Sequence, residues 1–457
     1  MPSIRPRFPI ALKLLLLSGC AASPSDGGEI EALAADLQRD LGARAEQAAA
    51  AARRSGDPWD LWSAFLELGA PEVLAARRDL ARARARERAL GVPPTMLDAE
   101  HMGDGGQHET QLMLAFDLPG LLGIGRTGAA QARARLAAAR EEAALAAASF
   151  RARHGLERAL AALAVARALE EELAGLEAEC APAEARLDLL SGRGWLPPDR
   201  VDAARTMLHH VAAMRLEQVG AIASARAAVA RASGLAPDSS WLDDPEACGL
   251  RMITRRTERR GDRADPDARE LLATHPDLDV ARLDYLGAEA DLRTACAERW
   301  PALWIGPNAM LTADDLFLGG VLRLELPWPP AAGAAVDAAR AARDAARALL
   351  ANELAAGQTA LVQRRAELAS AERALREHGE AAAEAAARWL RAAQARFAVD
   401  AEALPEWTMA IDQRARALLA RAAALSRWLI ATFDLSEALG RPPAVTRAAA
   451  AGTEGGR

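Results

Sequence analysis

Aromatic residues are scarce in this sequence, and their scarcity bounds the fold. Phe, Trp and Tyr make up 4% of the 457 residues, and tyrosine occurs once. Hydrophobic residues still make up 51%, because alanine and leucine are abundant. This mixture, interleaved with arginine and glutamate, is typical of long helices and coiled coils. It argues against several ordinary domains with aromatic-rich cores, which the length alone would allow.

The sequence lacks an excess of basic residues and, beyond its N-terminus, a long apolar run. The formal net charge is −7 at pH 7, which gives no indication of nucleic-acid binding. No run of 18 or more apolar residues occurs, so no membrane-spanning helix is predicted in the mature chain. If that chain crosses a membrane, we expect it to do so with strands.

Cysteine is rare, and its spacing carries no chemistry. Cys180, Cys248 and Cys296 lie far apart, without the spacing of a metal site or a redox pair. No glycine-rich phosphate loop follows a strand, and no nucleophile has the local context that catalysis requires. The sequence therefore predicts no catalytic residue, no metal site and no cofactor, and the chain is not expected to be an enzyme.

The fourth cysteine lies at the end of an N-terminal export signal. Basic residues precede the short apolar run 14–17, which leads into Leu17-Ser18-Gly19-Cys20. These four residues resemble the cleavage box of bacterial lipoproteins. The resemblance implies a signal peptide over 1–19 and acylation of Cys20 with palmitate, and Ala21 at the next position implies sorting to the outer membrane. The alternative is a chance cysteine in an ordinary signal peptide.

The chain after this signal contains an internal duplication. The alternating run that ends at Pro119 matches the run that ends at Pro327, 208 positions later. Gly234, followed by Leu-Ala-Pro, matches Gly440, followed by Arg-Pro, 206 positions later. Nearly equal offsets at both ends indicate duplication of a whole unit.

Each copy has the same predicted order of elements. A helix is followed by a window of strand character, a long alanine-rich helix, a break and a second helix. The two sets of ranges are 71–90, 93–119, 126–190 and 200–234, and 276–299, 301–327, 333–397 and 402–440. The predicted divisions are an anchored segment with a helix over 20–70, a first repeat over 71–237, a linker over 238–270, a second repeat over 271–443 and a flexible tail over 444–457.

The strand windows alternate between apolar and polar residues. Arg323 and Glu325 oppose the apolar positions of the second window, the pattern of a strand with lipid on one side and water on the other. The predicted lipid-facing residues are Leu112, Leu114, Phe116, Leu118, Leu322, Leu324 and Leu326. Each window holds two strands with a turn at 103–106 or 312–315, and Pro307 suits only an edge or an irregular position. Four strands cannot close a barrel around a pore, so we expect several copies to share one.

Four segments together resemble the TolC-type outer membrane factors. They are His275-Pro276-Asp277-Leu278, Glu298-Arg299-Trp300-Pro301, Leu324-Glu325-Leu326-Pro327 and Ala438-Leu439-Gly440, within a likeness that runs from about Glu29 to Pro443. The resemblance implies a mainly α fold, in which long antiparallel coiled-coil helices form an α-barrel and four strands join a shared β-barrel of a homotrimer. It also implies an outer-membrane efflux channel that extends into the periplasm and conducts passively. Its partners would be a periplasmic adaptor (membrane fusion) protein, an inner-membrane efflux pump and outer-membrane lipid.

The resemblance assigns the periplasmic mouth of the channel to the two helix–helix breaks, 186–202 and 396–407. The residues that it indicates for docking the adaptor are Gly194, Trp195, Arg396 and Phe397. The residues that it indicates for the gate are Asp400, Glu402 and Glu406. A threefold ring of such acids would attract cations. The alternative is that they are ordinary helix-start acids, favoured by the helix dipole.

A second function stays open from the sequence. The helices alone also fit a lipid-anchored periplasmic coiled-coil scaffold of the same fold without channel activity. The shortage of Trp and Tyr near the strand windows favours the scaffold, because membrane-spanning proteins usually carry these residues at the two interfaces.

Overall fold

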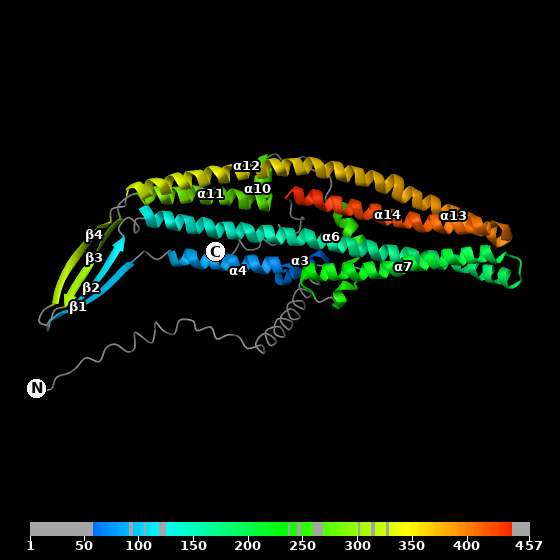
Figure 1. Ribbon diagram of the computed structural model, residues 1–457, viewed down its shortest axis with the longest axis horizontal. Helices are drawn as coiled ribbons and strands as arrows, with labels where there is room; N and C mark the ends of the chain where they lie inside the picture. Colours follow the sequence, from blue (N-terminus) through cyan, green and yellow to red (C-terminus); the bar gives the residue numbers. More distant parts are fainter. Residues whose placement is uncertain are drawn as a thin grey trace, which may run out of the picture.

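The protein is an elongated bundle of helices with a small sheet at one end (Figure 1). The computed structural model describes residues 58–90, 95–104, 107–117, 125–235, 238–244, 248–258, 268–299, 302–311, 316–325 and 329–440. The predicted signal peptide, the lipidated Cys20 and the tail after 443 lie outside the described residues.

Four long helical segments dominate the body. Helix α6, Gly125–Gly192, has 68 residues and is about 100 Å long at about 1.5 Å per residue. Such a rod is stable only when it packs along its length, and its neighbours are α4, α7, α11 and α14. The helices are α3 Pro58–Gly69, α4 Pro71–Leu90, α6, α7 Pro198–Ser233, α9 Leu250–Glu258, α10 Ala268–Thr274, α11 Pro276–Ala297, α12 Pro329–Arg373, α13 Ala381–Val399 and α14 Leu404–Ala438.

The helix predicted over 333–397 is not one continuous α-helix. A π-helical segment, Ala374–Glu380, separates α12 from α13. Gly379 is buried there against α14, where an added Cβ would lie 3.4 Å from the Cβ of Ala424. The wider turn thus occurs where the bundle is closely packed, and helical periodicity in the sequence does not reveal it.

The duplication predicted from the sequence recurs in how the last helix of each copy ends. Gly234 follows α7 with φ +74°, and Gly440 follows α14 with φ +61°. A Cβ on Gly234 would lie 2.4 Å from the carbonyl oxygen of Gly69, and one on Gly440 would lie 2.5 Å from the Cα of His275. Gly69 and His275 each lie just before a helix that begins with proline, α4 and α11. In both copies, the end of the last helix therefore packs on the backbone at the start of the first.

Several of the aromatic side chains lie in two core clusters. Trp59, Trp62 and Phe65 of α3 pack against α6, α7 and α14 in the middle of the molecule. Phe397 and Trp407 occupy a second cluster in the half that lies away from the sheet. Between these sites, leucine and alanine fill the interior, which allows the helix backbones to approach closely.

The four strands form one antiparallel sheet in the order β1-β2-β3-β4. The strands are β1 Thr95–Asp104, β2 Gln107–Asp117, β3 Ala302–Leu311 and β4 Leu316–Glu325. Strands β2 and β3 belong to different copies and pair with each other, so the sheet joins the two halves of the duplication. The predicted fold class, mainly helical with two strand pairs, is confirmed. Gly103 and Asp104, which the sequence assigned to the first turn, belong to β1.

The sequence predicted that Pro307 lies either at a sheet edge or at an irregular position, and the structure has it at an irregular position. Strand β3 lies between β2 and β4, so Pro307 is not at an edge. Its β4 neighbour is Gly320. Residues on both sides of Gly306 and Pro307 pair with β2, but Gly306 and Pro307 themselves do not. A Cβ on Gly306 would lie 1.8 Å from the carbonyl oxygen of Leu114, so glycine is required at this close approach. Pro307 has no N–H to donate, and it lies where the hydrogen-bond ladder between β2 and β3 is interrupted.

Candidate functional site

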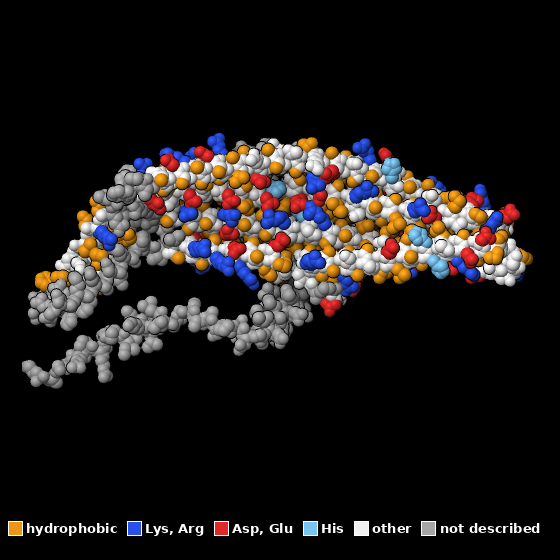
Figure 2. Space-filling view, in the orientation of Figure 1, with side chains coloured by type: hydrophobic (Ala, Val, Ile, Leu, Met, Phe, Trp, Pro, Cys, Tyr) orange, Lys and Arg blue, Asp and Glu red, His pale blue; other side chains and the backbone are white. Residues whose placement is uncertain are grey.

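One face of the sheet is apolar and exposed. In the register of β3 with β4, Ile305 lies opposite Leu322 and Ala309 lies opposite Leu318. Leu318 is 78% exposed and Leu322 is 70% exposed. We name this surface the apolar sheet face; its large residues are Leu112, Leu114, Phe116, Leu303, Ile305, Leu311, Leu316, Leu318, Leu322 and Leu324. A contiguous exposed apolar surface of this kind marks a contact with lipid or with another protein, and exposed hydrophobic side chains are visible over the strands in Figure 2.

Most of the predicted lipid-facing residues lie on this apolar sheet face. Leu118 and Leu326 fall outside the described residues. Residues on β3 and at the start of β4 were not predicted, although the alternation of Leu303, Ile305 and Leu311 was legible in the sequence. Pro307 in the middle of that run obscured it.

The opposite face of the sheet carries most of the polar side chains. Arg323 lies opposite Trp304, and Gln111 lies opposite Met310. Met113 and Asn308 form the next pair. Residues alternate between the two faces with a period of two, so the sheet has one apolar and one mixed polar surface, as a strand between hydrocarbon and water requires.

The two predicted helix–helix breaks lie together at the end of the molecule opposite the sheet (Figure 1). Gly194, with φ +69°, closes the turn between α6 and α7, and the N–H of Trp195 donates to the carbonyl of Leu190 over 3.0 Å. Leu196 from this turn and Leu404 at the start of α14 are buried in one cluster. The two hairpin tips therefore form a single packed unit, which we name the helical tip.

The structure separates the four predicted docking residues. Trp195 is 65% exposed, and the guanidinium carbon of Arg193 lies 5.2 Å from its ring centroid. Phe397, by contrast, is fully buried and stacks on Trp407 with ring centroids 5.2 Å apart. The expectation that Phe397 is a surface docking residue is therefore corrected: its ring supports the helical tip from within.

The predicted gate acids make contacts within their own hairpin. One carboxylate oxygen of Asp400 accepts from the N–H of Glu402 over 2.9 Å, which caps the short 3₁₀ turn Ala401–Ala403. Nη1 of Arg396 lies 2.9 and 3.0 Å from the two carboxylate oxygens of Glu406. Glu402 is exposed. Asp400 thus has the capping role of a helix-start acid, and Glu406 is partly neutralised by Arg396.

A network of ion pairs in the middle of the molecule was not predicted. Arg158 of α6 donates to Asp434 and Glu437 of α14, with Nε 3.0 Å from Asp434 Oδ1. Nη1 of Arg364 on α12 lies 3.2 Å from the other oxygen of Asp434. Burial lowers the pKa of Arg158, but the hydrogen bonds and charges of its two acidic partners outweigh burial and raise it overall. The network joins a helix of the first copy to two helices of the second.

Two histidines lie close to this network. His154 and Glu157 are both buried, with His154 Nδ1 3.0 Å from Glu157 Oε2. The ring of Phe150 contacts both histidines: its centroid lies 4.6 Å from that of His154 and 5.9 Å from that of His275. Burial is the largest cause that lowers the pKa of His275, against opposing effects of Asp277 and Glu437. Burial therefore favours the neutral form of His275.

The three later cysteines are all free thiols. Cys180 and Cys248 are buried, and burial raises the pKa of each to about 12; Cys296 is exposed. No group of three or more His, Cys, Asp or Glu residues in the described part of the chain is arranged to hold a metal ion. No helix among the described residues is both long and apolar enough to cross a membrane.

No protein-family model matches the sequence, and no curated protein matches it. Solved structures do match. A membrane protein from Pseudomonas aeruginosa is 17% identical with a TM-score of 0.69, and the match covers 83% of this chain and 91% of that one. The outer membrane protein VceC from Vibrio cholerae is 18% identical with a TM-score of 0.65, over 83% and 95% of the two chains. The open MtrE outer membrane channel of Neisseria gonorrhoeae is 15% identical with a TM-score of 0.69, over 83% and 88%.

These matches span nearly the whole length of each neighbour, so the likeness is one of the complete fold. At identities of 15–18% they establish the fold alone, and the residues of the site are assigned from the geometry of this chain. The long-helix fold with a small antiparallel sheet that the resemblance implies is therefore confirmed.

Proposed function

We propose that this chain, which has the fold of outer-membrane efflux channels, is itself such a channel subunit and conducts substrates passively from the periplasm to the outside. The observation that carries the proposal is the apolar sheet face at one end of a helical body about 100 Å long. Strands of 10 or 11 residues match the 9–11 or so that cross a bilayer when tilted. Hydrocarbon would cover Leu318 and Leu322, which water now reaches.

The free edges of the sheet support a homotrimer. Among the residues that the structure describes, strands β1 and β4 each have a neighbour on one side only. Unpaired backbone groups cannot face lipid, so the edges need sister strands. Three copies of a four-stranded sheet would close a barrel of twelve strands, whereas eight strands from two copies would leave almost no lumen.

We place the chain in the outer membrane, anchored by a palmitoylated Cys20 after removal of residues 1–19. In this arrangement the two repeats, 71–237 and 271–443, each supply a strand pair to the membrane and helices to the periplasm. The linker 238–270 would surround the middle of the helical body. The distance between the sheet and the helical tip, at opposite ends (Figure 1), supports an orientation with the tip deep in the periplasm.

The helical tip is the proposed contact with a periplasmic adaptor and, through it, an inner-membrane pump. Exposed Trp195 beside Arg193, with Gly194 between them and Arg396 on the neighbouring hairpin, offers an aromatic and cationic surface of the kind that forms interface hot spots. In a trimer, three copies of Asp400, Glu402 and Glu406 would line the mouth and favour cations.

Single-channel recording of the purified trimer in planar bilayers tests this function. We expect stepwise conductance from protein whose trimeric state and helical content have been verified. A folded trimer that inserts into the bilayer and stays silent would overturn the channel and favour the lipid-anchored scaffold of the same fold.

A further inference from the structure

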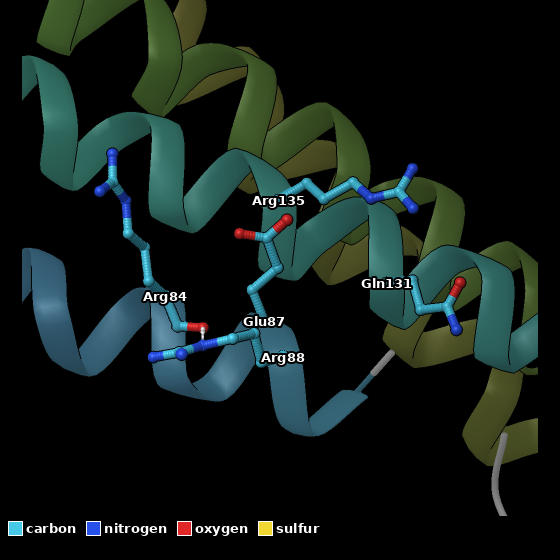
Figure 3. A pocket seen from close by; sticks show the side chains of 5 residues that line it. All are labelled: Arg84, Glu87, Arg88, Gln131 and Arg135. Carbon is cyan, nitrogen blue, oxygen red and sulfur yellow. Dashed lines mark hydrogen bonds between the residues drawn. The ribbon is translucent and has the colours of Figure 1, made fainter. Parts of the chain in front are cut away.

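An open groove lies between α4 and the start of α6, on the part of the helical body nearest the sheet (Figure 3). Its volume is about 550 Å³, and five side chains line it: Arg84, Glu87 and Arg88 of α4, and Gln131 and Arg135 of α6. Three arginines and one glutamate therefore line this groove, which we name the arginine groove, and in Figure 3 the three guanidinium groups point in different directions. Figure 2 shows basic side chains along the edge of the molecule that α4 forms.

The positive charge of the arginine groove is only partly compensated. Arg84 donates to Glu142 over 3.3 Å, and both side chains are largely exposed, so the pair is weak. Arg88 donates through Nε to the carbonyl of Arg84 over 3.3 Å, the bond drawn in Figure 3. Within the described part of the chain, neither Arg88 nor Arg135 is paired with a carboxylate.

Nearby arginines of α6 are engaged differently. Arg133 lies 2.5 Å from Asp291, and Arg140 lies 2.5 Å from Asp284. Both of these acids belong to α11 and neutralise the side of α6 that packs on it. Arg88 and Arg135 differ from these two arginines, because the groove beside them is open and leaves room for an external anion.

The position of the groove identifies the anion. Arg88 lies two residues before the end of α4, and β1 begins at Thr95. Gln131 lies six residues into α6, about 9 Å from its start at about 1.5 Å per residue. The groove is therefore next to the level at which the sheet begins. If the apolar sheet face spans hydrocarbon, this is the level of the phosphate groups of the periplasmic leaflet.

We propose that the arginine groove binds the phosphate headgroup of an anionic phospholipid. The proposal rests on the proposed function, because it requires the sheet to lie in the membrane. Guanidinium groups match phosphate oxygens in pairs and remain charged at every physiological pH. Lipid is favoured over soluble phosphate because the proposed membrane position of the apolar sheet face brings lipid headgroups to the level of the groove.

Native mass spectrometry of the full-length trimer, released from detergent, tests the proposal with added phosphatidylglycerol, phosphatidylcholine or inorganic phosphate. We expect the wild type to retain phosphatidylglycerol in preference to phosphatidylcholine. The triple variant R84Q/R88Q/R135Q should lose about fivefold in affinity for each guanidinium removed. Equal retention of the two lipids by the wild type, or undiminished phosphatidylglycerol binding by the variant, would overturn the proposal.

A matched control removes three arginines elsewhere. Arg205 pairs with Asp188 over 3.0 Å, as Arg84 does with Glu142. Arg427 donates through Nε to the carbonyl four residues earlier over 3.3 Å, as Arg88 does. Arg391 is exposed on α13, as Arg135 is on α6. The variant R205Q/R391Q/R427Q makes the same change in net charge and should retain phosphatidylglycerol like the wild type; an equal loss would show that overall charge, and not the groove, holds the lipid.

Two further readouts separate the possible failures. Inorganic phosphate that displaces phosphatidylglycerol at equal concentration would overturn the lipid as the ligand. Conductance recorded in phosphatidylcholine bilayers tests the channel by itself. A conducting wild type with no preference for phosphatidylglycerol would overturn only the groove, whereas a folded trimer that never conducts would overturn the proposed function.

Discussion

A charge placed on the apolar sheet face distinguishes a membrane surface from a water-exposed one. Leu322 is 70% exposed in the single chain, and it lies between one and two residues from the midpoint of β4, about 5 Å at about 3.4 Å per residue. An arginine facing lipid near the midplane costs about 2–4 kcal/mol. Three copies bring the cost of Leu322→Arg to about 6–12 kcal/mol for each trimer. In water, the same exposed position would tolerate arginine within about 0.5 kcal/mol.

The matched control is Leu216→Arg on α7, where the leucine is 73% exposed on the helical body. Trimers of each variant would be refolded into liposomes, and the inserted fraction would be measured by flotation along with the urea concentration that unfolds them. We expect Leu322→Arg to reduce insertion severely and Leu216→Arg to leave it unchanged. Insertion of Leu322→Arg at the wild-type level, with the same urea midpoint, would refute the assignment of this face to lipid.

Three further predictions follow from the geometry. Gly440→Ala should destabilise the protein by at least about 2 kcal/mol, because φ +61° and the contact with His275 both oppose a Cβ; Gly357→Ala, with open space around it, should be neutral or slightly stabilising. Burial lowers the folded-state pKa of His275 below 6.5. As pH drops, the unfolded state therefore binds a proton at this residue before the folded state does, so stability should fall below about pH 6.5. The urea midpoint of His275→Gln should fall less than that of the wild type between pH 7.5 and 5.5, and an equal fall in both proteins would contradict the lowered pKa of His275. Glu406→Gln should leave Arg396 uncompensated and shift the reversal potential of the channel toward anions. The control Glu384→Gln removes an exposed acid that pairs with Arg388 on α13, and it should leave the reversal potential unchanged.

The positions of the helices were predictable because proline and glycine mark their ends. Helix α4 begins at Pro71 and ends at Leu90, as the sequence predicted, and α11 begins at Pro276. The alternation in β2 and β4 likewise predicted which residues share a face. These are local patterns, so they are legible without knowledge of the tertiary fold.

Contacts between distant segments could not be predicted in this way. Arg158 meets Asp434 across 276 positions of sequence, and nothing in either local pattern distinguishes this pair from other charges on exposed helix faces. The burial of Phe397 depends on Trp407 of the next helix and on Arg186 of α6, whose guanidinium carbon lies 5.8 Å from its ring. Family likeness placed Phe397 at the tip, but only packing determines whether a tip residue points outward or inward.

The interrupted ladder beside Pro307 illustrates a third case. The sequence indicated that proline needed an exceptional position, but an edge and an irregular ladder were equally compatible with it. The close approach of Gly306 to Leu114 shows that the ladder is irregular at this point. Predicting this contact requires knowing which strand of the first copy pairs with β3. Pairing between the two copies, through β2 and β3, is a property of the folded chain.

Spin labels placed one at a time along β4 test the central claim most directly. Single cysteines from 316 to 324, in a protein whose Cys180, Cys248 and Cys296 are replaced by serine, would be labelled in reconstituted trimers and exposed to oxygen or to a water-soluble nickel relaxant. We expect accessibility to alternate with a period of two, with oxygen reaching Leu316, Leu318, Leu322 and Leu324 and nickel reaching Phe317 and Arg323. Nickel accessibility at all positions, without alternation, would contradict a sheet that separates hydrocarbon from water.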